Sequence, residues 1–264
     1  MTDFVRFQAE DGVALLTLDS PATRNALLSA REYGAIADAC SRIAGDRSIR
    51  VAVLTGAGPA FCAGGNVKEM AERARAMAHE AVEDRYAYKD GIHRIARALM
   101  DLEVPCIAAV NGPAIGAGLD LACMCDIRIA GASARFAESF VRLGIIPGDG
   151  GAWLLQRIVG FAHAAEMTFT GETIDADRAL AIGLVSRVVA DGELVAEALS
   201  LARRIADNPG HALRMAKRLM REAQTVSFDT VLEMSAAFQA LAHATGDHGE
   251  RIARASGRLG KGKS

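Results

Sequence analysis

The sequence predicts an α/β fold, and three kinds of pattern carry that prediction. Two short apolar runs flank a turn near the N-terminus, two longer apolar runs end in glycine, and amphipathic helix patterns alternate with them. Strands and helices that alternate along a chain are typical of domains in which helices cover a largely parallel sheet.

The N-terminal stretch FVRFQAEDGVALLTLDS, residues 4–20, predicts a β-hairpin. Two short runs of alternating apolar and polar residues lie on either side of Glu10-Asp11-Gly12. An acidic residue followed by glycine between two such runs is a strong turn signal. The chain is therefore expected to begin with two antiparallel strands.

The segment SAREYGAIADACSRI, residues 29–43, predicts an amphipathic helix. Ser29 and Glu32 have the spacing of a capping box at its start. The apolar side chains recur at helical spacing on one stripe: Tyr33, Ile36, Ala37, Cys40 and Ile43.

Two continuous apolar runs predict buried parallel strands. They are RVAVLTG, residues 50–56, and CIAAVNG, residues 106–112, and both end in glycine. A terminal glycine lets the backbone turn sharply where the strand ends.

The pattern changes near residue 193, after which three helical segments follow without a strand signal. The sequence thus predicts an α/β core over residues 1–192 and a helical region over 193–264 that ends in a basic, glycine-rich tail. The leucine, methionine and phenylalanine surface of these helices is a candidate for contact with a partner chain.

Charge and composition exclude several classes of function. The 264 residues include 30 basic and 32 acidic side chains, for a formal charge of −2, and the basic residues are spread out. This balance argues against general binding to nucleic acid or to an anionic membrane, and it leaves a small anionic ligand open. Neither a membrane-spanning run nor a targeting segment is evident, so a cytoplasmic protein is expected.

The five cysteines predict reduced thiols in a core. They are odd in number and lie in apolar stretches, which does not suit a disulfide framework. Cys123 and Cys125 lack the paired knuckles of a zinc site, and His243 and His248 are wrongly spaced for two ligands on one helical face. No metal is expected.

Two glycine-rich turns join an apolar strand to a helix, over residues 53–70 and 108–124. Each turn leaves N–H groups unpaired at a helix N-terminus, and such groups attract a negative or partly negative oxygen. A Rossmann fingerprint needs a further glycine where Phe61 and Leu121 stand, and no Gly-Lys-Ser/Thr of a P-loop follows. Taken singly, these glycines could serve only tight turning and close packing.

Taken together and in order, the motifs resemble those of the crotonase family, also called the enoyl-CoA hydratase/isomerase family. The likeness runs from about residue 4 to 250 and includes PATRNAL, AFCAGGNVKEM, VNGPAIGAGLDLACMCDIRIA and RFAESFVRLGIIPGDGG. It continues through the segment from VGFAHAAEM to LVSRVV and into the helical C-terminus. The resemblance implies a spiral of ββα units, a C-terminal helical trimerisation region, a homotrimer or dimer of trimers, and an acyl-coenzyme A thioester as ligand.

The resemblance also implies where a thioester would bind. The N–H groups of Gly65 and Ala117 would grip its carbonyl oxygen as an oxyanion hole. Arg24 and Lys68 would contact the coenzyme A phosphates, while Ala63 and Asn66 line the channel; the alternative for Arg24 and Lys68 is a solvated surface charge. No cofactor is implied beyond the coenzyme A of the substrate.

Two positions depart from the hydratase pattern, in which two glutamates position a water. The first falls on Asp120, a shorter carboxylate, and the second falls on Phe140, which cannot transfer a proton. Some isomerases and dehalogenases of the family place a catalytic aspartate further along, at a position that is strictly Gly148 here, with Asp149 next to it.

These departures leave several interpretations open. In the first interpretation, Asp120 and Asp149 act together as general acid and base. In the second, Asp120 acts alone and Asp149 caps the following helix. A slip of one or two residues in the loop would bring in Glu138. The third is a catalytically weak acyl-CoA-binding protein, and the enzymatic runner-up is an acyl-CoA hydrolase or decarboxylase with Phe140 as an apolar pocket floor.

The sequence analysis therefore predicts an acyl-CoA enzyme of the enoyl-CoA hydratase/isomerase type. Gly65 and Ala117 are expected to polarise the thioester carbonyl. Asp120 is expected to move a proton with help from Asp149, because a buried carboxylate in an apolar segment is costly without a task.

Overall fold

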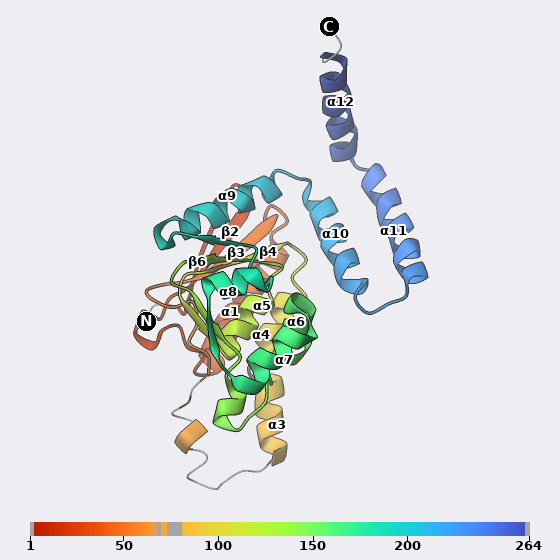
Figure 1. The fold of residues 1–264 in the computed structure, drawn as a ribbon. Helices are drawn as coiled ribbons and strands as arrows, with labels where there is room; N and C mark the ends of the chain where they lie inside the picture. The colour runs from red at the N-terminus through yellow and green to blue at the C-terminus, as the bar shows by residue number, and fades with distance from the viewer. Residues whose placement is uncertain (1–2, 66, 68–69, 73–80, 262–264) are drawn as a thin grey trace. The chain divides into compact units, whose positions relative to one another are not determined.

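The structure is a computed structural model that describes residues 3–65, 67, 70–72 and 81–261. The chain divides into two compact units, residues 1–206 and 207–264 (Figure 1). The boundary follows helix α9 (Leu194–Ala206), whereas the sequence analysis places the change before this helix. The physical reason is that α9 packs on the main sheet, so it belongs to the first unit.

The first unit is built on a six-stranded sheet in the order β1-β2-β3-β4-β6-β9. Strands β1 and β2 form the predicted antiparallel hairpin, and every later neighbour in this sheet is parallel. The strands are β1 (Val5–Glu10), β2 (Val13–Leu18), β3 (Val51–Gly56), β4 (Cys106–Val110), β6 (Ile127–Gly131) and β9 (Arg187–Val189). The apolar runs predicted as strands are thus β3 and β4, at the centre of the sheet.

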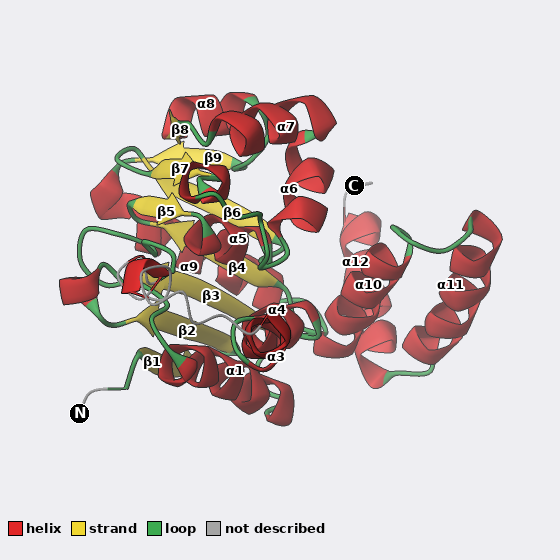
Figure 2. Cartoon of the chain, turned by 90° about the horizontal axis from the view of Figure 1, so that it is seen from below, coloured by secondary structure: helices red, strands yellow, loops and turns green. Residues whose placement is uncertain are grey.

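Side chains of successive residues in β3 point to opposite faces of the sheet, and each face has its own core. Val51 and Val53 lie in the cluster that α9 covers. Ala52 and Leu54 lie in the larger cluster, which includes residues of α1 (Ala30–Gly45) and α4 (His93–Met100). Because both faces are covered, the central strands read as continuous apolar runs in the sequence (Figure 2).

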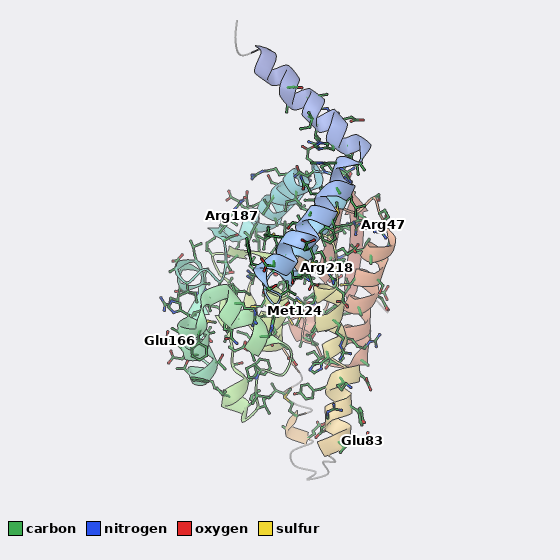
Figure 3. All side chains as sticks on the ribbon, turned by 90° about the vertical axis from the view of Figure 1, so that its right-hand side faces the viewer. Arg47, Glu83, Met124, Glu166, Arg187 and Arg218 are labelled. Carbon is green, nitrogen blue, oxygen red and sulfur yellow. The ribbon has the colours of Figure 1, made fainter. Side chains whose placement is uncertain are left out.

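A second, three-stranded sheet in the order β5-β7-β8 stands beside the main one. Its strands are β5 (Pro113–Ile115), β7 (Arg135–Ala137) and β8 (Thr173–Asp175). The other helices of the first unit are α3 (Ala81–Asp90), α5 (Ala117–Cys123), α6 (Gly151–Val159), α7 (Phe161–Thr170) and α8 (Ala176–Ala181). Met124, labelled in Figure 3, follows α5 and is buried.

The predicted helix after Ser29 is α1, and the Ser29 hydroxyl caps it. The Ser29 Oγ accepts from the N–H of Arg31 and donates to the Glu32 carboxylate at 2.7 Å. The predicted cap therefore forms, with the glutamate bound to the serine hydroxyl. All five cysteines are free and buried, as the sequence analysis predicts.

The second unit contains helices α10 (Gly210–Glu222), α11 (Phe228–His243) and α12 (Gly246–Lys261). Helix α11 contains no buried residue, although its sequence is rich in large apolar side chains. In the described part of the chain, no helix is both long enough and apolar enough to cross a membrane.

Candidate active site

The two glycine-rich turns predicted from the sequence lie side by side. The Cys62 N–H donates to the Pro113 carbonyl at 3.1 Å, and the Ile115 N–H donates to the Cys62 carbonyl at 3.1 Å. The first turn is thus bonded along β5, directly before helix α5 begins.

Glycine is required at two points where these turns touch. Gly64 has φ +89°, and a Cβ there would lie 2.5 Å from the Ile115 carbonyl oxygen. A Cβ on Gly118 would lie 2.0 Å from the Cys62 carbonyl oxygen. Both contacts are with backbone, which cannot swing aside, so only glycine permits this approach.

The close approach brings together the backbone donors predicted at Gly65 and Ala117. The Cβ position of Gly64 lies 3.6 Å from the Ala117 nitrogen. Ala117 is the first residue of α5, where an N–H has no partner within the helix. Neither the Gly65 N–H nor the Ala117 N–H donates a hydrogen bond to another residue that the structure describes. The two turns can therefore offer a pair of backbone donors to a partly negative oxygen.

Asp120 follows one turn along α5 and is fully buried. Its Oδ2 accepts a hydrogen bond of 3.1 Å from the N–H of Gly151, the first residue of α6. The N-cap position of α6 is Gly150, and no side chain bonds there. The side chain that reaches the start of α6 thus comes from Asp120, and the cap proposed for Asp149 is not seen among the described residues.

Glu138, named in the sequence analysis only as the product of a loop slip, lies in the same cluster without any slip. It follows β7, and both of its carboxyl oxygens are buried without a hydrogen-bond donor in the described chain, as is Oδ1 of Asp120. A Cβ on Gly151 would lie 2.1 Å from Oδ1 of Asp120 and 2.4 Å from Oε1 of Glu138. These two oxygens therefore crowd around the same point.

Asp149 is the third buried carboxyl group of the cluster, at 5% exposure. Its neighbour Gly148 accepts a hydrogen bond of 2.8 Å from Nε2 of His93 on α4. A carbonyl oxygen only accepts, so Nε2 carries the hydrogen. A Cβ on Gly148 would lie 3.1 Å from the Tyr88 ring of α3. Helices α3 and α4 therefore contact the loop that carries Asp149. Nothing in the sequence around His93 predicts this contact.

Burial raises the pKa of all three carboxyl groups. The pKa of Asp120 is raised well above its usual range by burial and then by the charges of Glu138 and Asp149. Burial raises the pKa of Glu138 to about 8, and the neighbouring Asp120 carboxyl has a smaller, opposing effect. Burial raises the pKa of Asp149 to about 6, with a smaller opposing effect of His93. Perturbed carboxyl groups that meet near unpaired backbone donors are typical of an active site.

Phe140, at the second acid position of the hydratase pattern, packs at the start of α5. A Cβ on Gly116 would lie 3.6 Å from the tip of its ring. The ring is 8% exposed and supplies an apolar surface next to the Ala117 N–H. The site therefore combines backbone donors, buried acids and an apolar wall.

Of the remaining predicted residues, Ala63 lies on the first turn and Arg24 is hydrogen-bonded to it through the backbone. Arg24 is exposed, has φ +54°, and accepts a hydrogen bond of 3.0 Å at its carbonyl from the N–H of Ala63. Asn66 and Lys68 lie outside the described residues.

Asn25, which sequence reasoning missed, anchors this turn from a fully buried position. Its Nδ2 donates to the carbonyls of Ala57 and Ala60, at 2.9 and 2.8 Å. The only sequence signal for Asn25 was its place in the motif PATRNAL, directly after Arg24. Its side chain holds the first turn in shape.

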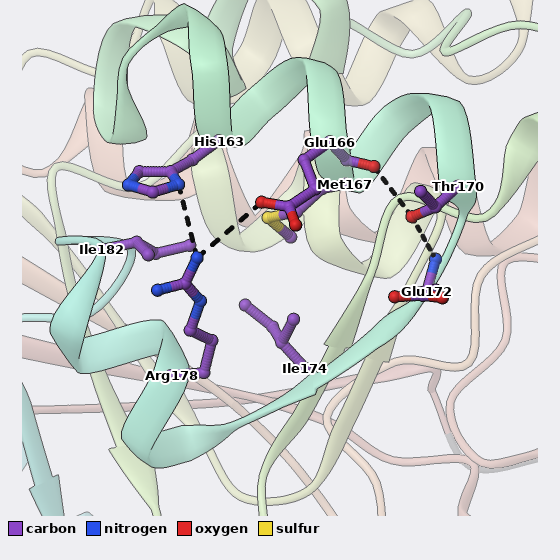
Figure 4. A pocket seen from close by; sticks show the side chains of 8 residues that line it. All are labelled: His163, Glu166, Met167, Thr170, Glu172, Ile174, Arg178 and Ile182. Carbon is purple, nitrogen blue, oxygen red and sulfur yellow. Dashed lines mark hydrogen bonds and ion pairs between the residues drawn. The ribbon is translucent and has the colours of Figure 1, made fainter.

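A separate hollow of about 180 Å³ lies among α7, β8 and α8 (Figure 4). An ion pair of 3.7 Å joins Arg178 to Glu166 across it, and a hydrogen bond of 3.5 Å joins Arg178 to His163. None of the three acids of the site lines this hollow.

Comparison with known proteins assigns the chain to a family. The family model for enoyl-CoA hydratase/isomerase matches residues 8–253. The chain belongs to the enoyl-CoA hydratase/isomerase family. As a member of this crotonase family, it is an enzyme of the lyase or isomerase kind.

Curated relatives and solved structures agree with this family. A short-chain-enoyl-CoA hydratase of Clostridium acetobutylicum is 38% identical, over 86% of this chain and 85% of the relative. A 1,2-epoxyphenylacetyl-CoA isomerase of Escherichia coli is 35% identical, over 96% and 95%. The structure of an enoyl-CoA hydratase from Bacillus anthracis matches with a TM-score of 0.88 and 32% identity, over 97% of this chain and 96% of that one. The crotonase fold that the sequence analysis predicts is thereby confirmed.

Proposed function

We propose that this family member acts on an enoyl-CoA thioester and moves a proton next to the thioester carbonyl. The Gly65 and Ala117 N–H groups bind the carbonyl oxygen, and Asp120 transfers the proton with help from Asp149. One observation carries the proposal: two backbone donors, which have no partner among the described residues, lie on touching turns next to a helix whose buried Asp120 belongs to a cluster of acids.

The chemistry requires this combination. Removing a proton beside a thioester places negative charge on its oxygen, and a preset donor in a water-poor site stabilises that charge by roughly 3 to 4 kcal/mol. A carboxyl group whose pKa is raised toward neutrality both takes and returns a proton effectively near pH 7. Burial provides such pKa values here.

Hydration and double-bond migration share this first requirement, and the relatives named above include a hydratase and an isomerase. In both reactions the thioester carbonyl is polarised while a proton enters or leaves the chain of carbon atoms. They differ in whether water adds. The apolar ring of Phe140 in place of the second acid favours proton movement within the substrate.

The coenzyme A part of the substrate is assigned to the first turn. Arg24 and Ala63, which are joined through their backbones, would line its path together with Asn66 and Lys68. No cofactor is proposed beyond the coenzyme A that the substrate carries.

The experiment is incubation of the enzyme with short, long, branched and aromatic enoyl-CoA thioesters in water labelled with heavy oxygen. Loss of enoyl ultraviolet absorbance with uptake of labelled oxygen identifies hydration, and a shift of absorbance without uptake identifies isomerisation. Release of free thiol identifies hydrolysis, and loss of carbon dioxide from a carboxylated acyl-CoA identifies decarboxylation; either result alone contradicts the proposal. Binding without turnover of any thioester also contradicts it, since it indicates an acyl-CoA-binding protein.

A further inference from the structure

Glu138 is the one fully buried acid of the site to which the proposed function gives no task. Its two oxygens and Oδ1 of Asp120 have no donor among the described residues. Leaving a buried polar atom without a partner costs about 1 to 3 kcal/mol, and more for a charged group. Three such atoms in one cluster need an explanation.

The geometry around Gly151 indicates what these atoms bind. The position that a Cβ of Gly151 would occupy is 2.1 Å from Oδ1 of Asp120 and 2.4 Å from Oε1 of Glu138. The absence of a side chain at Gly151 thus leaves room for two carboxyl groups that face each other. Two ionised carboxylates this close repel each other, whereas a carboxylic acid and a carboxylate form a strong hydrogen bond.

We propose, on the basis of the proposed function, that Asp120 and Glu138 share one proton and that Glu138 is a positioning residue which sets the protonation state of Asp120. The pair then carries a single negative charge and contains one acid and one base. The hydratase pattern has its second acid at the position of Phe140. Glu138, two residues earlier in the chain, supplies that acid here.

The other groups around the pair leave this charge state intact. Cys123 on α5 and Cys62 on the first turn are neutral thiols, because burial raises the pKa of both, that of Cys62 to about 12. Asp149 adds a negative charge that opposes ionisation of the second member of the pair, and His93 acts on Asp149. The N–H of Gly151 donates to the other oxygen of Asp120 and holds that carboxyl in place.

The shared proton gives a balanced reaction step. The bond between hydrogen and the carbon next to the carbonyl breaks, and its electron pair moves to the thioester oxygen, held by Gly65 and Ala117. The proton passes to Asp120, so that the pair holds two protons and becomes neutral. Return of one proton to the substrate carbon, at the same or a more distant atom, restores the singly charged pair.

Infrared difference spectroscopy of the enzyme without substrate tests the pair directly. We expect the carbonyl band of a protonated carboxylic acid at pH 7, lost only as the pH rises beyond about 8. In Asp120→Asn and Glu138→Gln the remaining acid faces a neutral amide instead of a carboxyl group, so the band should change in frequency and titrate at a different pH. Asp149→Asn should keep the band, and so should Glu10→Gln, a matched change of an exposed glutamate.

A wild-type spectrum without this band at pH 7 overturns the proposal, and so does a band whose frequency and titration are unchanged in Glu138→Gln. Melting temperatures of the variants show that each is folded. The infrared readout needs no substrate, so a failure of the proton-sharing proposal is distinguishable from a failure of the proposed function. The proposed function fails if Asp120→Asn keeps full turnover while the infrared band behaves as expected.

Kinetics then separate positioning from mere support of the fold. Glu138→Gln should lower kcat about 10- to 100-fold with little change in KM, since Glu138 acts through Asp120 in this proposal. The wild type is expected to lose activity at alkaline pH, when the shared proton leaves the pair. Glu138→Gln has no shared proton, so its pH profile should lack this alkaline loss. An unchanged pH profile in a folded, slower variant contradicts the proposal.

Discussion

Asp120 is a buried acid within an apolar helix, and its two carboxyl oxygens have different surroundings. The Gly151 N–H binds one oxygen, and Glu138 faces the other. An acid so fixed has a set orientation and a raised pKa, the two properties that proton transfer needs.

Asp120→Asn should lower kcat by about 100- to 10,000-fold on the true substrate, because an amide cannot accept the proton. The binding of substrate should change little, since the backbone donors and the coenzyme A contacts remain. Steady-state kinetics with the thioester that turns over best provide the measurement. Full turnover in this variant contradicts the role of Asp120.

Asp149→Asn should lower turnover and at the same time stabilise the protein near neutral pH. The folded pKa of Asp149, about 6, lies above the ordinary value of 3.8, so the folded state binds more protons than the unfolded state between these values. The free energy of unfolding of the wild type therefore falls as the pH rises through this window, by about 3 kcal/mol for this group.

The measurement is the difference in unfolding free energy between Asp149→Asn and the wild type, from pH 4 to pH 8. It should be near zero at the acidic end, grow up to about pH 6, and then stay constant. A variant that is less stable at every pH, with turnover intact, indicates a structural role for Asp149.

At the scale of elements, the site depends on how closely the first turn approaches α5. Backbone contacts at Gly64 and Gly118 set this approach, and hydrogen bonds along β5 maintain it. The donors at Gly65 and Ala117 are backbone N–H groups, so no side chain provides these hydrogen bonds. Their placement is a property of two segments about fifty residues apart in the chain.

Gly118→Ala should separate these segments, because the new Cβ meets the Cys62 carbonyl oxygen at 2.0 Å. Displacing one donor of an oxyanion hole costs about 100- to 1,000-fold in turnover. Gly34→Ala in α1 is the matched control, since nothing lies within 4 Å of its new Cβ, and it should keep full turnover. Equal activities of the two variants argue against the proposed oxyanion hole.

At the scale of the whole molecule, the second unit leaves apolar side chains uncovered. In α11, Phe228, Leu232 and Leu241 are each at least half exposed. Phe228 and Leu232 are four residues apart and so lie on one face of α11, which makes this face a candidate for contact with another protein. We propose that it joins copies of this chain into the trimer, or dimer of trimers, that the family resemblance implies.

Sedimentation velocity tests this assembly. The wild type should sediment as a trimer or a hexamer, and Phe228→Asp should shift the population toward smaller species by placing a charge in the interface. Phe161→Asp, at an exposed phenylalanine of the first unit, is the matched control and should leave the assembly unchanged. A wild type that is monomeric at micromolar concentration contradicts the proposal.

Local signals in the sequence predict several elements of the fold correctly. The hairpin around Gly12, the helix after Ser29 and the buried strands of the central sheet follow from turn chemistry, capping and the apolar runs of doubly covered strands. The ordered motifs also determined the family. Such features depend on residues close together in the chain, so their pattern can be read without the fold.

Which acids meet depends on the tertiary structure. Asp120 lies on α5, the N–H of Gly151 starts α6, and Glu138 directly follows β7; the space between the two carboxyl groups exists because Gly151 has no side chain. The hydratase pattern points to Phe140, and it reaches Glu138, two residues earlier, only through a slip of the loop. The direction of a side chain at the end of a strand depends on the packing of distant segments, and burial in that packing is also what shifts the pKa of each acid.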